Sequence, residues 1–211
     1  MKTDRETMII TIYVIIDTLC QKLLFAPAQK QKLTDGEVIT IAICSAIFFH
    51  SNHDKSLAWL RASGYFPEML SLSRYNRRIH QLKDFMEFCF ESVSEFFATG
   101  ELYIEDSMPL PVCKRVRASR NKKVQGKEYC GCCVAKKEKF YGFRLHLIVD
   151  TKGIPASMTI LPGAYHDLTP IYEITAPLPH DSTVIGDKAF NCASDESRLK
   201  ELGTTMMPRR F

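Results

Sequence analysis

The chain has 211 residues, of which 45% are hydrophobic and 25% charged, enough apolar material for one large domain or two small ones. This composition excludes a largely disordered chain, and the apolar stretch at residues 8–16 is too short to cross a bilayer. Acidic residues at positions 4 and 6 argue against an export signal, and eight scattered cysteines are typical of a reducing cytoplasm. We therefore expect a cytoplasmic protein with no membrane role.

The net charge of +4 hides an uneven distribution. Between Lys114 and Arg144 there are 11 basic and two acidic residues, so this segment carries +9 (11 − 2) and the rest of the chain −5 (4 − 9). Such a block favours a polyanionic partner, nucleic acid above all, over the alternative of a merely solvated loop.

Residues 1–98 are expected to be helical. The sequence predicts five helices there, over residues 8–24, 38–49, 56–62, 73–83 and 85–96. Thr34 or Asp35 is expected to cap the second helix, which is apolar on nearly every side and is expected to be buried all round.

The fourth of these helices is rich in arginine. It carries Arg74, Arg77 and Arg78, which are candidates for contacts with the backbone or a groove of duplex DNA. The alternative is an ordinary solvated face.

The periodicity changes after Gly100. Strands are expected over residues 102–105, 140–150, 154–161, 182–186 and 204–207, and helices over residues 167–174 and 194–202. Asp167 is expected to cap the first of these helices, and Ser194 or Asp195 the second. The order predicts an α/β domain with a mixed sheet over residues 99–211, preceded by the helical region 1–98.

Two aspartates each follow a short β-branched run, 81 positions apart (187 − 106). Strand ends that are distant in sequence can lie side by side in a mixed sheet, so Asp106 and Asp187 could share one site. Paired carboxylates beside a phosphate-attracting surface point to divalent-metal phosphodiester chemistry, with Mg²⁺ (or Mn²⁺) as the hard cation that oxygen ligands suit. Taken alone, each aspartate would more commonly be a turn or cap residue.

A basic loop begins seven residues after Asp106 and has seven basic residues and no acid over residues 113–127. Contacts with phosphates are the favoured interpretation, and a solubility patch is the alternative. The candidate DNA-contacting residues of this region are Lys114, Arg115, Arg117, Arg120, Lys122, Lys123, Lys136 and Lys137. Cys130, Cys132 and Cys133 lack the spacing of common zinc sites, so we expect reduced thiols.

In their order and spacing these motifs resemble the DDE-type transposases of bacterial insertion sequences, and most closely the insertion-sequence group nine-eight-two. The matching text is Ile104-Glu-Asp-Ser-Met-Pro-Leu-Pro-Val-Cys-Lys114, Tyr129–Cys133, Lys136–Leu147, Gly153-Ile-Pro155, His166-Asp167 and Gly186-Asp-Lys188, with Leu33–Ile39 and Ser73–Arg78 upstream. The resemblance implies a ribonuclease-H-like core and a two-metal mechanism of DNA cleavage and strand transfer. It also implies double-stranded DNA as the partner (the element's terminal inverted repeats and the target), a location at the bacterial nucleoid, and is compatible with a homo-oligomer.

By position, Asp106 and Asp187 match the family's first two catalytic acids and metal ligands, and Lys188 matches the basic residue after the second. The Gly-Tyr that usually follows is replaced here by Ala189-Phe190. The third acid is expected beyond Phe211, because Glu196 and Glu201 come too early. We therefore expect a core truncated at its C-terminus that binds DNA but cuts and joins it poorly or not at all. The alternatives are a non-catalytic DNA-binding fragment and a metal-dependent nuclease.

Overall fold

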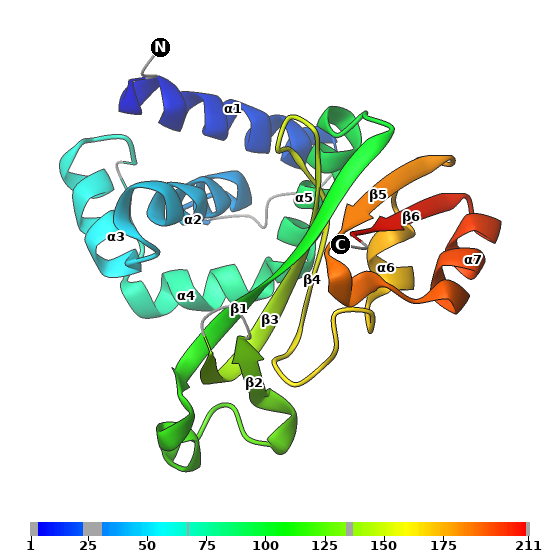
Figure 1. Ribbon diagram of the computed structural model, residues 1–211. Helices are drawn as coiled ribbons and strands as arrows, with labels where there is room; N and C mark the ends of the chain where they lie inside the picture. Colours follow the sequence, from blue (N-terminus) through cyan, green and yellow to red (C-terminus); the bar gives the residue numbers. More distant parts are fainter. Residues whose placement is uncertain (1–3, 23–30, 67, 134–136, 210–211) are drawn as a thin grey trace. The chain divides into compact units, whose positions relative to one another are not determined.

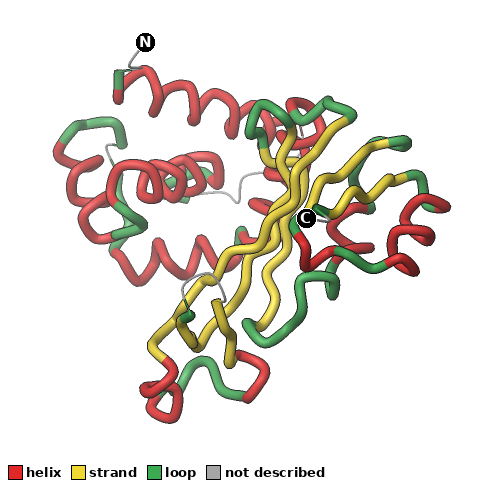
Figure 2. Tube along the Cα trace, in the orientation of Figure 1, coloured by secondary structure: helices red, strands yellow, loops and turns green. Residues whose placement is uncertain are grey.

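The computed structural model describes residues 4–22, 31–66, 68–133 and 137–209. The chain divides into two compact units, Met1–Phe90 and Glu91–Phe211. The first contains only helices in its described part, and the second contains the strands (Figures 1 and 2). Within the described residues, no helix has the length and apolar character needed to cross a membrane.

The helical unit contains α1 (Arg5–Lys22), α2 (Asp35–Phe49), α3 (His53–Ala62), α4 (Leu72–Gln81) and the first part of α5 (Lys83–Phe97). All five predicted helices are present. Thr34 caps α2 in a capping box: its side chain accepts a hydrogen bond from the backbone N–H of Glu37, whose carboxylate accepts one from the N–H of Thr34. The core of the unit centres on Ile41, Leu60 and Tyr75, all with no exposed surface.

The second unit is built on one six-stranded mixed sheet with the order β2–β3–β1–β5–β6, in which β4 also pairs with β3. Its strands are β1 (Leu102–Lys114), β2 (Cys130–Cys133), β3 (Glu138–Asp150), β4 (Pro155–Pro162), β5 (Ser182–Gly186) and β6 (Thr204–Pro208). β3 lies antiparallel to β1, β2 and β4, whereas β1, β5 and β6 run parallel. The predicted α/β class with a mixed sheet and a helical region before it is confirmed.

The two faces of this sheet differ. On one face α6 (Ile171–Thr175) and α7 (Ala193–Glu201) close a core that includes Tyr103, Ile148 and Val184. On the other face large apolar side chains are exposed on β1, β4, β5 and β6: Ile104, Met108, Met158, Ile160, Ile185 and Met207. We call this second surface the open face.

β1 is much longer than the four residues expected from the sequence. It includes prolines at positions 109 and 111, which are unusual inside a strand because proline cannot donate a ladder hydrogen bond. Pairing between β1 and β5 stops at Ile104, however, so from there on β1 has a neighbour only on the β3 side. Pro109 and Pro111 are two residues apart, so both place their missing N–H on the same side of the strand, and the side without a neighbour tolerates this.

Two predicted helix caps are wrong. α6 begins only at Ile171, and Asp167 lies before it with its carboxylate engaged elsewhere. α7 begins at Ala193 with Cys192 in the cap position, so neither Ser194 nor Asp195 caps it. The side chain of Asp195 instead accepts a hydrogen bond from the Tyr172 hydroxyl at 2.5 Å, which links α7 to α6.

Candidate catalytic site

Asp106 lies within β1, and Asp187 directly follows the neighbouring parallel strand β5. The last registered pair of β1 and β5 is Ile104 with Ile185, and each aspartate lies two residues further along its strand direction. Neighbouring strands lie about 4.8 Å apart, so the pairing of β1 with β5 brings together the two segments that lead to these aspartates, which are 81 positions apart in the sequence (187 − 106).

Each of these carboxylates has one oxygen held by a nearby backbone N–H. Oδ1 of Asp106 accepts from Ser107 at 2.8 Å, and Oδ1 of Asp187 accepts from Ala189 at 2.7 Å. Asp187 thereby caps the short 3-10 turn Lys188–Phe190, in which Ala189 takes the place of the expected glycine without needing a positive φ. Both aspartates are exposed, and so is Lys188.

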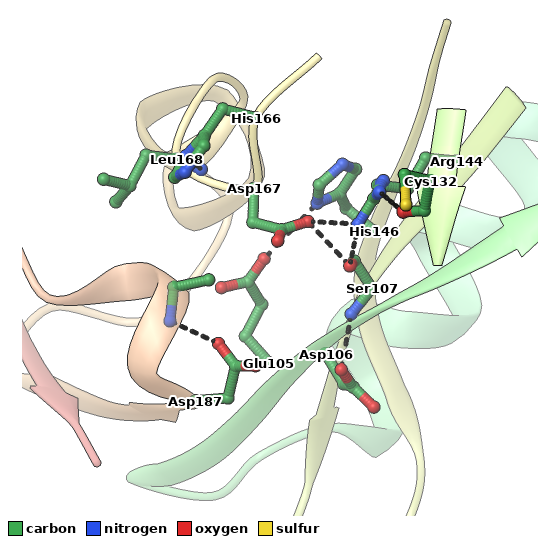
Figure 3. A network of polar contacts seen from close by, with 11 residues as sticks. Glu105, Asp106, Ser107, Cys132, Arg144, His146, His166, Asp167, Leu168 and Asp187 are labelled. Carbon is green, nitrogen blue, oxygen red and sulfur yellow. Dashed lines mark hydrogen bonds and ion pairs between the residues drawn. The ribbon is translucent and has the colours of Figure 1, made fainter. Parts of the chain in front are cut away.

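A polar network lies next to Asp106 on the covered face of the sheet (Figure 3). The Asp167 carboxylate accepts hydrogen bonds from the Ser107 hydroxyl at 2.7 Å and from Arg144 Nη1 at 2.9 Å. Arg144 also donates to the Ser107 hydroxyl at 3.2 Å and to the backbone oxygen of Cys132 at 3.0 Å. The network thus ties β1, β2, β3 and the loop before α6 together, one residue from Asp106.

Glu105 points away from Asp106, toward Asp167 (Figure 3). Its carboxyl oxygens have no hydrogen-bond partner among the described residues, and neither have the ring nitrogens of His146, whose Nδ1 lies 3.7 Å from Glu105 Oε1. Burial, and then the charges of Asp167, Asp106 and Asp187, raise the pKa of Glu105 to about 9. Burial lowers the pKa of His146. Both groups are therefore neutral at pH 7, so the distance between them does not represent an ion pair.

The sequence did not predict this network, because the strand over residues 140–150 was predicted from its alternating apolar residues. Leu145, Leu147 and Val149 alternate as expected, but they are only half-buried and lie on the open face. The intervening residues, with His146 and Ile148 fully buried, form the face toward α6. The available signal was a run of polar residues at every second position in both β1 and β3, since cross-strand neighbours on one face recur with that period.

The basic segment forms an arm at the far end of β1, which we define as residues 114–129. It contains two 3-10 turns, Arg115–Arg120 and Lys127–Tyr129, and the Tyr141 hydroxyl anchors it by donating to the backbone oxygens of Val124 and Gly126. The predicted contact residues Lys114, Arg115, Arg117, Arg120, Lys122 and Lys123 are all exposed. None of these six has an ion pair with a described acid.

The arm is not adjacent to the carboxylates, although its first residue comes soon after Asp106 in the sequence. Lys114 lies eight positions after Asp106 along β1 (114 − 106), which corresponds to about 26 Å of extended chain. Lys137 is exposed at the start of β3, and Lys136 lies outside the described residues. Cys130, Cys132 and Cys133 are free thiols on β2.

The three predicted arginines of α4 are placed differently from one another. Arg74 and Arg77 are exposed, whereas Arg78 is partly buried and forms an ion pair with Asp35 at the start of α2.

The two carboxylates are candidate ligands for a metal ion. Among the described residues, no group of three His, Cys, Asp or Glu side chains is placed to hold one. Asp106 and Asp187 nevertheless have the hard oxygen donors that Mg²⁺ prefers, and each keeps one oxygen clear of a backbone N–H. Both side chains therefore carry the type of donor that Mg²⁺ uses.

Comparison with known proteins gives a family match. A family model described as "Transposase DDE domain" matches residues 97–210, more than half of the chain. No curated protein matches the sequence.

Two solved structures are similar in part. The piggyBac transposase synaptic complex with hairpin DNA shows 10% identity and a TM-score of 0.42, covering 98% of this chain and 42% of that one. The Mos1 transposase paired-end complex with left transposon end shows 13% identity and a TM-score of 0.34, covering 86% of this chain and 60% of that one. The chain thus spans less than two thirds of either.

Proposed function

Because the chain belongs to the family of transposase DDE domains, we propose that it acts in DNA transposition through a metal site built on Asp106 and Asp187. The observation that carries this proposal is that each aspartate comes two residues after the paired Ile104 and Ile185 of the parallel strands β1 and β5. DNA cleavage and strand transfer at element ends are the corresponding reactions.

Asp106 and Asp187 would hold Mg²⁺, or Mn²⁺, which when bound activates a water or 3′-hydroxyl nucleophile and stabilises the leaving oxygen. The residues around them keep the two carboxylates in place. The N–H of Ser107 fixes one oxygen of Asp106, and the N–H of Ala189 fixes one of Asp187. Lys188 is exposed beside Asp187 and would contact a phosphate of the bound DNA.

The partner we propose is double-stranded DNA, held along a path from the carboxylates to the basic arm. The six exposed arm cations lack acidic partners among the described residues, so they are available to phosphates. The interval of about 26 Å corresponds to about eight base pairs of duplex. One DNA molecule would therefore contact the carboxylates and the arm at positions most of a helical turn apart.

At a finer level we propose an insertion-sequence transposase of group nine-eight-two. The support is the ordered text from Ile104 to Lys188, which includes the Met-Pro-Leu-Pro of β1, the basic run before β3 and the Gly-Asp-Lys at the end of β5. We also propose low activity for the 211-residue chain, since among the described residues no three His, Cys, Asp or Glu side chains are grouped to hold a metal ion.

The test is nicking of a labelled duplex that carries an element end, with Mg²⁺ or Mn²⁺, by the 211-residue chain. We expect Asp106→Asn and Asp187→Asn each to abolish metal-dependent nicking while leaving DNA affinity within about twofold. Glu201→Gln, which alters an exposed acid on α7, is the matched control and should keep wild-type nicking. Analysis of the products separates joining from cutting alone. Nicking that persists in both aspartate variants would exclude the proposed site.

A second candidate is DNA binding without chemistry. It is favoured by the absence of a three-ligand cluster among the described residues. It predicts duplex binding that needs no metal and no nicking by the wild-type chain under any metal condition.

A further inference from the structure

α1 is apolar on two opposite sides, and only one of them packs within the helical unit. Ile9 and Ile16 are 2% and 5% exposed and belong to the core of this unit. On the other side, every exposed residue of α1 between positions 7 and 18 is uncharged: Thr7, Ile10, Thr11, Val14, Ile15 and Thr18. We call these six residues the α1 stripe. A helix that is apolar all round is normally buried all round, yet no described residue covers the α1 stripe.

The threonines of the α1 stripe do not prevent its burial. The Thr11 hydroxyl donates to the backbone oxygen of Thr7 at 2.7 Å, and the Thr18 hydroxyl donates to that of Val14 at 2.6 Å. Because both hydroxyls already donate inside the helix, a partner could cover them without leaving an unpaired donor. The aliphatic residues among them are 51%, 55% and 43% exposed: Ile10, Val14 and Ile15. The α1 stripe thus offers β-branched, largely apolar surface over about three turns.

The side chains of the α1 stripe follow nearly the same order in both directions along the helix. From the N-terminus they are Thr, Ile, Thr, Val, Ile and Thr, and from the C-terminus Thr, Ile, Val, Thr, Ile and Thr. A two-fold rotation of α1 onto an antiparallel copy therefore places Ile10 against the copy's Ile15, and likewise Thr7 against Thr18. Thr11 then lies against Val14, a β-branched side chain of similar shape. A two-fold interface requires such self-complementarity, so the pattern fits a second copy of this chain.

Opposite charges at the two ends of α1 favour the same arrangement. Asp4 and Lys22 are 18 positions apart (22 − 4), which corresponds to five turns of helix, so both lie on one side of it. Both are exposed, and neither has an ion pair with a described residue. An antiparallel pair brings the Asp4 end of each copy beside the Lys22 end of the other and opposes the two helix dipoles. A parallel pair would bring like charges together.

We propose that the α1 stripe is an interface through which two copies of this chain pair, with their α1 helices antiparallel. An 18-residue helix is about 27 Å long, so one helix pair buries less than the roughly 1,600 Å² of a standard interface. The dimer is therefore weak, with a dissociation constant on the order of 100 µM. The interface belongs to the helical unit and depends neither on the open face of the sheet nor on the proposed function.

Sedimentation equilibrium of the full 211-residue chain, without DNA and up to roughly 500 µM, measures this dimer. Every variant carries Ile185→Lys/Met207→Lys, which removes association through the open face. Ile10→Glu/Ile15→Glu brings like charges together in either orientation of the helices and should raise the dissociation constant tenfold or more. Ile10→Glu/Ile15→Lys brings opposite charges together only in an antiparallel pair, so its dimer should be about tenfold tighter than that of the double-glutamate variant. Both positions are exposed, so circular dichroism and Tm should not change.

Ile47→Glu is the matched control. It places a charge on an isoleucine of α2 that is 49% exposed and lies outside the α1 stripe, and it should leave the dissociation constant unchanged. An equal loss in this control would show that exposed apolar surface in general drives the pairing. A chain that stays monomeric at 500 µM before α1 is altered, or an unchanged constant in Ile10→Glu/Ile15→Glu, would overturn the proposal. Equal dissociation of the two Ile10/Ile15 variants would overturn the antiparallel arrangement.

Discussion

Oε1 of Glu105 lies 3.7 Å from Nδ1 of His146, and neither side chain has any exposed surface. A buried carboxyl and a buried imidazole without hydrogen bonds are costly, and the cost is lowest when both are neutral. The direction of both pKa shifts agrees with this state. Glu105 directly precedes the exposed Asp106 in β1, so this destabilising pair lies beside the candidate site.

Glu105→Gln should change how stability depends on pH. The pKa of Glu105 rises from an ordinary 4.5 to about 9 in the folded chain, so the folded state binds its proton more tightly. That stabilisation is complete below pH 4.5 and is lost as the pH rises through about 9. The wild type should therefore lose stability from pH 7 to 9, and the glutamine variant should lose less.

The measurement is thermal unfolding at pH 7, 8 and 9 in the presence of a chelator. His146 does not interfere, since its lowered pKa confines its effect to more acidic solution. At pH 8 the variant should melt a few degrees above the wild type, given that 1 kcal/mol corresponds to roughly 2–4 °C in a chain of this size. Glu101→Gln, at an exposed position just before β1, should leave the profile unchanged. Parallel profiles for wild type and Glu105→Gln would contradict the buried, neutral state.

Asp167→Ala should destabilise the second unit. It removes the acceptor of both Ser107 and Arg144 and leaves an arginine side chain that is only 16% exposed without its counter-charge. We expect a loss of roughly 2–4 kcal/mol in urea unfolding. Asp167→Asn keeps an oxygen for Ser107 and should lose about 1 kcal/mol. Glu201→Ala serves as the exposed control, and an equal loss in it would show that the network contributes nothing specific.

The sequence predicted element types well where a pattern is local. Four residues, from Thr34 to Glu37, are enough to predict the capping box of α2, and a glycine turn between two alternating runs predicts the β3–β4 hairpin. Prediction failed where the conformation depends on a neighbouring strand that is distant in the sequence. Pro109 and Pro111 are acceptable in β1 because its pairing with β5 stops at Ile104, which no local pattern reveals.

The candidate site shows the same limit. Asp106 and Asp187 were identified from expected settings at strand ends, which is correct for Asp187 after β5 but wrong for Asp106, since β1 continues to Lys114. Glu105 was overlooked because a buried glutamate next to an exposed aspartate cannot be told from a second surface acid without knowing which face of β1 is covered. Asp167 was assigned to a helix cap because its acceptor role toward Arg144 depends on a contact 23 residues away.

Arg78→Ala should destabilise the helical unit, whereas Arg77→Ala should not. Arg78 joins α4 to Asp35 and Gln31 and is about one-fifth exposed, while Arg77 is exposed and has no described partner. We expect a loss of roughly 2–3 kcal/mol for Arg78→Ala and less than about 0.5 kcal/mol for Arg77→Ala. Urea unfolding followed by circular dichroism measures both. Equal effects would mean that the Asp35 contact does not hold α4 in place.

The open face of the sheet should cause the 211-residue chain to self-associate. Ile185 and Met207 pair across β5 and β6 and are 39% and 55% exposed, and among the described residues β6 pairs with no strand other than β5. Exposed apolar residues at an unpaired strand edge favour contact between copies, and charged residues there oppose it. Sedimentation should show association of the wild type at tens of micromolar and a shift toward monomer in Ile185→Lys/Met207→Lys. Leu202→Lys, an exposed apolar position just after α7, should leave the association unchanged. If it dissociates the chain equally, general solubility rather than the open face controls the assembly.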